Sequence, residues 1–252
     1  MEGIPGAIPL MQNTDGLETM IPDAYIDKYL EICSEWEKTT QLELEHNEYQ
    51  KLILADVNNY IAINKFKEVS EEKFNELNEE YPHGLFKKED GKFFWAPTKC
   101  KGRFEFENLA LHKNKSFLIV PKALFAYFIK DVPPEQFLQD NRNIFDYCGG
   151  VKIKGDWEFQ QICVSNQQIV KAPLQKTLRY YISERGCKII KAHKQDGREI
   201  QLESGKWMQQ LFNVFEEKPW KDYDIDESYY LDKIYKEIRN ILPPAKKQLS
   251  LF

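Results

Sequence analysis

The sequence predicts an α+β fold, in which a β-hairpin, a helix and antiparallel strands precede a second region of mixed helices and strands. Three observations carry this prediction. An Asp-Gly pair between two short apolar runs is typical of a hairpin. Apolar residues at helical spacing follow Pro22, and short runs with strand character recur after them.

The first region is expected to be a small meander packed on one helix. Its hairpin joins residues 8–12 to residues 17–21, and the helix begins at Pro22 and ends near Trp36. Ser70 is placed to cap a short polar helix that ends near Asn78, and a charged turn surrounds Gly91. Strands are expected at residues 41–45, 51–55, 59–63, 93–95 and 103–106.

A change of character near residue 115 predicts a domain boundary, so that the domains are residues 1–115 and 116–242, with a tail at 243–252. Helices are expected around residues 123–128, which Pro133-Pro134 ends, and at 135–141 and 227–242. Strands are expected at residues 157–164, 177–183 and 188–192. The tail after Pro243-Pro244 carries no secondary-structure signal.

The composition indicates a folded protein that is not embedded in a membrane. Hydrophobic residues make up 42% of the chain, charged residues 30%, and the net charge is −5. No signal peptide is apparent, and no apolar stretch approaches the roughly 20 residues that span a bilayer. Five scattered cysteines without a C-x-x-C pair argue against disulfides and a zinc ribbon, which indicates reduced cysteines in the cytoplasm.

Two segments of the chain have a functional interpretation and a purely structural alternative. Asp15 at the hairpin tip is either a carboxylate that holds Mg²⁺ or part of a common Asp-Gly turn. Residues 167–194 hold seven Lys or Arg against Glu184 alone, with two tyrosines among them. This stretch is either a nucleic-acid interface or the solvated face of a sheet.

The last five residues, Gln248-Leu249-Ser250-Leu251-Phe252, resemble the peptides that bind bacterial sliding clamps. In this interpretation Leu249, Leu251 and Phe252 fill an apolar cleft and Gln248 makes a directional hydrogen bond at its rim. The alternative is a C-terminal strand that folds back on the domain.

Several segments together resemble a phage-type family B DNA polymerase, in order and over nearly the full chain. Residues 11–18 resemble the third catalytic motif, in which the second aspartate, here Asp15, binds the catalytic metal ions; Asn13 replaces the first. Residues 56–62, with Tyr60, resemble a motif that lies along the primer–template duplex. Lys99-Cys100-Lys101-Gly102 resembles the palm element that follows it.

Later segments resemble the thumb domain of the same family. They are residues 114–116, 123–128, 143–146, 174–181 and 229–241. The resemblance implies that the first domain is the C-terminal part of a palm and the second a thumb. It also implies two groups of DNA contacts: Asn59, Tyr60, Lys99, Lys101 and Gly102 in the palm, and Lys176, Arg179 and Tyr180 in the thumb.

The resemblance implies template-directed nucleotidyl transfer by two Mg²⁺ ions, with primer–template DNA, a dNTP and a sliding clamp as partners, in a bacterial or phage-infected cell. The family's first and second motifs do not occur in this sequence. We therefore expect activity only with an upstream polypeptide that carries them and shares the metal site. The alternatives are a non-catalytic DNA-binding processivity module and another clamp-tethered replication or repair factor, such as a nuclease.

Overall fold

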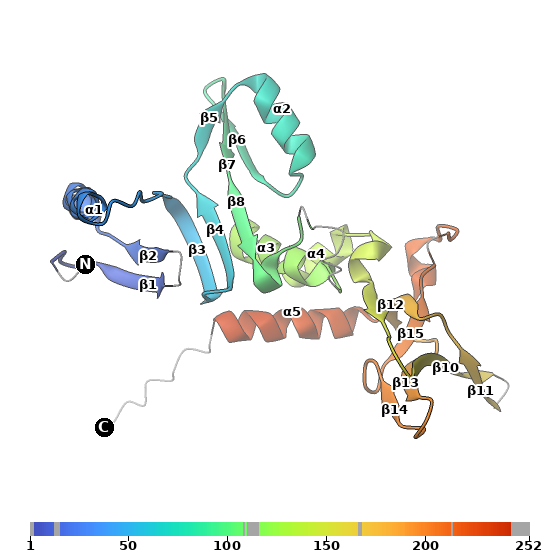
Figure 1. The fold of residues 1–252 in the computed structure, drawn as a ribbon. Coiled ribbons are helices and arrows are strands. Elements are labelled where there is room, and N and C mark those ends of the chain that lie inside the picture. Colours follow the sequence, from blue (N-terminus) through green and yellow to red (C-terminus); the bar gives the residue numbers. More distant parts are fainter. Residues whose placement is uncertain are drawn as a thin grey trace, which may run out of the picture. The chain divides into compact units, whose positions relative to one another are not determined.

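A computed structural model describes residues 3–12, 16–107, 109, 116–165, 168–212 and 214–242. The chain forms two compact units, unit 1 (Met1–Arg103) and unit 2 (Phe104–Phe252), so the division comes earlier than the predicted boundary near residue 115. Both units combine helices with small antiparallel sheets, as the α+β prediction requires (Figure 1). No helix in these described ranges is long and apolar enough to cross a membrane.

The hairpin that begins unit 1 forms where the Asp-Gly pair predicts it. Strand β1 (Ile8–Gln12) pairs with β2 (Leu17–Met20), and Gln12 lies opposite Leu17. The tip, residues 13–15, lies outside the described residues, and so does the predicted metal ligand Asp15.

The helix after the hairpin is longer than predicted. A 3-10 turn η1 (Asp23–Tyr25) leads into α1 (Ile26–Thr40), which passes Trp36 and ends where Gln41 adopts a left-handed conformation, with φ 59°. The strand predicted at residues 41–45 is wrong, since these residues pair with no strand and Leu42 and Leu44 are exposed. Alternating Leu and Glu produces a strand only where a partner strand accepts its backbone.

The core of unit 1 is the sheet β3–β4–β8, whose central strand is β4 (Asn59–Asn64). It pairs on one side with β3 (Tyr49–Asp56) and on the other with β8 (Thr98–Lys101). Residues 61–63 of β4 are at most 1% exposed. The buried apolar run and the hydrogen bonds on both sides make β4 a firm support for the residues at its ends.

A second sheet of unit 1 consists of β5 (Lys67–Val69), β7 (Lys92–Ala96) and β6 (Leu85–Glu89), with α2 (Glu71–Glu80) packed against β7 (Figure 1). The predicted cap is confirmed, because the Ser70 hydroxyl accepts the Lys73 N–H at 3.2 Å. Phe74 of α2 packs on Phe86 and Phe93, with ring centroids 5.3 and 5.2 Å away. The strand predicted at residues 103–106 is wrong, since a 3-10 turn η2 (Gly102–Phe104) takes its place.

Three helices form the helical part of unit 2: α3 (Ile119–Lys130), α4 (Pro134–Asp140) and α5 (Glu227–Ile241). The predicted apolar stripe of α5 is buried at Tyr230, Ile234 and Ile238. Its last member, Leu242, follows the end of the helix and is 54% exposed. The Tyr230 hydroxyl donates to the Tyr147 carbonyl at 2.8 Å and accepts the Ile182 N–H at 2.9 Å. These bonds tie α5 to the short helix η3 (Ile144–Tyr147) and to a strand of the neighbouring sheet.

Two antiparallel sheets complete unit 2, and all three strands predicted there are confirmed. One sheet has the order β15 (Trp207–Gln210), β12 (Thr177–Ser183), β9 (Gly149–Lys152). The other has the order β11 (Gln168–Pro173), β10 (Trp157–Ser165), β13 (Lys188–His193), β14 (Glu199–Gln201). The sequence analysis did not predict β9, β11, β14 and β15, which are short or polar. A last 3-10 turn, η4 (Trp220–Tyr223), precedes α5.

The expectation that all cysteines are reduced is wrong, because Cys163 and Cys187 form a disulfide. The register of β10 and β13 pairs Ile162 with Lys188, so the next residues outward, Cys163 and Cys187, face each other with Cα atoms 4.5 Å apart. They are 24 residues apart in the sequence, and only the strand pairing brings them together. Cys33, Cys100 and Cys148 form no disulfide.

Candidate nucleic-acid interface

The five palm residues that the resemblance predicts as DNA contacts come together at one end of the sheet β3–β4–β8. Tyr60 of β4 lies opposite Lys101 of β8, and Ala62 lies opposite Lys99. Residues two apart on a strand share a face, so both lysines project on the same side as Tyr60. The two Nζ atoms lie 6.0 Å (Lys99) and 5.9 Å (Lys101) from the centroid of the Tyr60 ring. We call Lys99 and Lys101 the lysine pair.

Tyr60 supports the lysine pair rather than offering a surface of its own. Its side chain is 5% exposed, whereas Lys99 is exposed and Lys101 half-buried. A cation over the face of an aromatic ring is stabilised by the ring quadrupole. The buried ring of Tyr60 therefore positions two charged groups that can reach a ligand, and a direct contact of Tyr60 with DNA stays a prediction.

Asn59 is held by its neighbours in the tight connection between β3 and β4. Its amide nitrogen donates to both carboxylate oxygens of Asp56, at 2.8 and 2.9 Å, and its amide oxygen accepts the Arg103 N–H at 2.8 Å. The bond from Asn59, followed by that from the Asn58 N–H, lowers the pKa of Asp56. This amide links β4 to the end of β8, and the role of Asn59 as a DNA contact stays a prediction.

Gly102 is required by the same connection. Its φ is +65°, and a Cβ atom there would lie 2.2 Å from the Asn58 carbonyl oxygen and 2.3 Å from the Asn59 amide oxygen. A residue with a side chain cannot occupy the position unless the connection moves. Gly102 therefore acts through the backbone, by letting the chain turn directly after Lys101.

Glu18 of β2 lies beside the lysine pair, and the sequence analysis did not identify it. Burial raises the pKa of the Glu18 carboxyl, and the positive charge of Lys99 offsets part of that rise. The described residues contain no group of three His, Cys, Asp or Glu side chains that could hold a metal ion. Asp15, the predicted metal ligand, lies outside the described residues.

The predicted thumb contacts of unit 2 divide into exposed and buried residues. Lys176 and Arg179 are exposed at and beside β12. Tyr180 is 5% exposed and packs edge-on against Phe117, with ring centroids 6.0 Å apart, and its burial raises its pKa to about 12. The ring of Tyr180 thus belongs to the core of unit 2, and its contact with DNA stays a prediction.

The basic stretch at residues 168–194 does not form one uninterrupted positive face. Lys171 pairs with Glu199 at 2.6 Å and Arg185 with Asp224 at 2.7 Å. Lys188 lies over the Trp207 ring, with Nζ 5.5 Å from the centroid. Part of the positive charge is therefore compensated within the fold. Arg179 differs from these residues because its guanidinium lies over an exposed ring, Phe145, at 5.2 Å.

Comparisons with known proteins find no match for the chain among protein-family models, curated proteins or solved structures. The clamp-binding residues Gln248, Leu249, Leu251 and Phe252 lie outside the described residues.

Proposed function

We propose that this chain is a C-terminal palm and thumb portion of a DNA polymerase, and that its lysine pair holds the sugar–phosphate backbone of the primer–template. The observation that carries the proposal is the convergence of Tyr60, Lys99 and Lys101 on one sheet face. Lysines neutralise phosphates and fix the position of a duplex without reading its bases. That is the contact which a polymerase needs, because it must hold every sequence equally.

Asp15 would bind the Mg²⁺ ions of this polymerase, together with a carboxylate from the family's first motif. Bound Mg²⁺ would lower the barrier by stabilising the charge that develops on the reacting oxygens. Glu18 is the one carboxylate in the described part of the hairpin, and its electrostatic interaction with Lys99 makes it a partner of the lysine pair.

The DNA-binding part of the proposal is tested by fluorescence anisotropy with a labelled primer–template. Replacing both Lys99 and Lys101 by Ala should weaken binding about tenfold or more, because two charge-assisted contacts are lost. The matched control is the double variant K73A/K92A, which removes two exposed lysines of unit 1 that pair with Glu76 and Glu68. Equal affinity of the two double variants would contradict the proposal.

The catalytic part is tested by primer extension after mixing the chain with a polypeptide that carries the two missing motifs. The mixture should extend a primer, and Asp15→Ala should abolish extension while leaving primer–template affinity within about twofold. If the folded mixture does not extend the primer although the chain binds DNA, the polymerase assignment is wrong. A non-catalytic processivity module is then favoured, since the lysine pair would suit it equally.

A further inference from the structure

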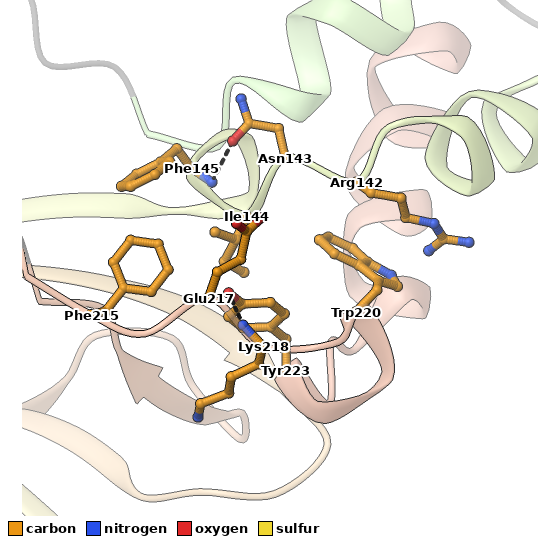
Figure 2. Close-up of a pocket in the computed structure, with 9 residues that line it drawn as sticks. All are labelled: Arg142, Asn143, Ile144, Phe145, Phe215, Glu217, Lys218, Trp220 and Tyr223. Carbon is orange, nitrogen blue, oxygen red and sulfur yellow. Dashed lines mark hydrogen bonds between the residues drawn. The ribbon is translucent and has the colours of Figure 1, made fainter.

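Unit 2 contains a pocket that the sequence analysis did not identify. It has a volume of about 520 Å³, a size typical of small-ligand sites. Two segments line it: residues 142–145, which run into η3, and residues 215–223, which end with η4 (Figure 2). We call it the aromatic pocket.

The walls of the aromatic pocket are flat rings. Phe145 and Phe215 stand together on one side, with ring centroids 5.5 Å apart and planes at 75°, and Trp220 stands on the other (Figure 2). Ile144 and the buried Tyr223 lie between the two sides. Phe145 is 43% exposed, so part of its ring faces the space of the pocket. The space between the sides is thus bounded by apolar and aromatic surface.

Positive charge accompanies both walls. The Arg142 guanidinium lies over the Trp220 indole at 5.1 Å, and the Arg179 guanidinium lies over Phe145 at 5.2 Å. Lys218 lines the pocket as well. Two acids lie nearby: Glu227, which is 3.4 Å from Arg142, and Glu217 in the lining. Within the lining itself, Arg142 and Lys218 carry positive charge and Glu217 carries negative charge.

Hydrogen bonds fix the two loop segments. The Asn143 side chain accepts the Phe145 N–H at 3.1 Å, and the Lys218 N–H donates to the Tyr223 hydroxyl at 3.2 Å (Figure 2). Trp220 also packs on the buried Tyr147, with centroids 5.1 Å apart. A pocket whose walls are already ordered spends less free energy on ordering when it binds a ligand.

We infer that the aromatic pocket binds an unpaired base of single-stranded nucleic acid, with the flanking phosphates held by Arg142, Arg179 and Lys218. Aromatic walls stack with any base, and cations beside them neutralise the strand. A base within a duplex is stacked between its neighbours and cannot enter such a space. The inference goes beyond the proposed function, because it concerns a second site, in unit 2, that does not depend on the lysine pair.

The test compares two labelled ten-nucleotide strands in anisotropy titrations of the full chain: oligo(dT) and an abasic strand with the same phosphates. The pocket predicts that oligo(dT) binds about tenfold or more tightly, because stacking is lost without bases. Phe215→Ala and Phe215→Leu should reduce oligo(dT) affinity to the level of the abasic strand. The control is Phe212→Ala, which removes a 54% exposed ring of unit 2 outside the pocket.

Equal affinity for the two strands, or an effect of Phe212→Ala as large as that of Phe215→Leu, would overturn the inference. Thymidine monophosphate serves as a competitor: displacement of oligo(dT) at equal concentration would show a free-nucleotide site and overturn the assignment to a strand. The K99A/K101A variant should retain oligo(dT) binding and its sensitivity to Phe215. An unchanged duplex affinity of the K99A/K101A variant would contradict the proposed function. An unchanged oligo(dT) affinity of the Phe215 variants would contradict only the pocket inference.

Discussion

The lysine pair of unit 1 and the aromatic pocket of unit 2 both combine aromatic rings with cations, but the rings differ in exposure. In unit 1 the ring of Tyr60 is buried and the cations above it face outward, whereas in unit 2 Phe145 is 43% exposed and borders a cavity. A buried ring cannot stack on a base, so the lysine pair is suited to phosphates alone. An exposed pair of walls offers stacking as well as charge.

The two sites also differ in what holds them. The lysine pair is positioned by the register of β4 and β8 and by the connection at Asn59 and Gly102. The aromatic pocket is held by loop hydrogen bonds and by ring packing on the core. A substitution that disrupts what holds one site should therefore leave the other site intact.

The largest expected effect is the loss of the disulfide in unit 2. The variant C163S/C187S should lower the free energy of unfolding of unit 2 by about 2–4 kcal/mol, because the unfolded chain is no longer constrained. Urea unfolding followed by hydrogen exchange in each unit measures this. Exchange in unit 1 and duplex affinity should stay unchanged. If the urea midpoint of unit 2 is the same with and without a thiol reductant, the disulfide does not stabilise it.

A somewhat smaller effect is expected in unit 1. Gly102→Ala should cost about 1–3 kcal/mol and weaken duplex binding, because the positive φ and the Cβ contacts force the connection after Lys101 to move. Gly91→Ala is the control: its φ is +75°, but a Cβ there meets nothing within 4 Å. Oligo(dT) binding should be unaffected by both variants. If Gly91→Ala weakens duplex binding as much, positive φ alone explains the effect, and the connection is not what positions the lysine pair.

The smallest effect concerns Glu18 and pH. Burial raises the Glu18 pKa above its ordinary value of 4.5, so the folded state binds this proton more tightly than the unfolded state. The contribution to stability is present below pH 4.5 and is lost as the pH rises through the folded-state pKa. Glu18→Gln should remove this decline in unit 1. The free energy of unfolding is measured for wild type and variant at several pH values above 4. The same decline with pH in both proteins would contradict the assignment.

Regular elements of the fold could be predicted where a local pattern decides them. The Asp-Gly pair predicted β1 and β2, Ser70 predicted the cap of α2, and the apolar stripe predicted α5. The strand pattern at residues 41–45 failed, because pairing depends on a partner that the local sequence does not reveal. The disulfide was missed for the same reason, since only the register of β10 and β13 brings its cysteines together.

The candidate sites likewise include residues that a local pattern reveals and residues that only tertiary packing brings together. Lys99, Lys101 and Tyr60 were selected from short motifs, and the register of β4 and β8 brings them onto one sheet face. The burial of Tyr180 had a signal in the alternation of Leu178, Tyr180 and Ile182 on one strand face, all of which are buried. The aromatic pocket had none, because two loop segments of irregular sequence meet there through tertiary packing.

The most direct test of the lysine pair is the salt dependence of primer–template binding. The logarithm of the association constant falls with the logarithm of salt concentration by about 0.9 for each duplex phosphate that is neutralised. Replacing Lys99 and Lys101 by Ala should therefore make the slope shallower by about 1.8 units. The K73A/K92A control should keep the wild-type slope. A K99A/K101A variant with the wild-type slope would show that these lysines do not contact the DNA backbone.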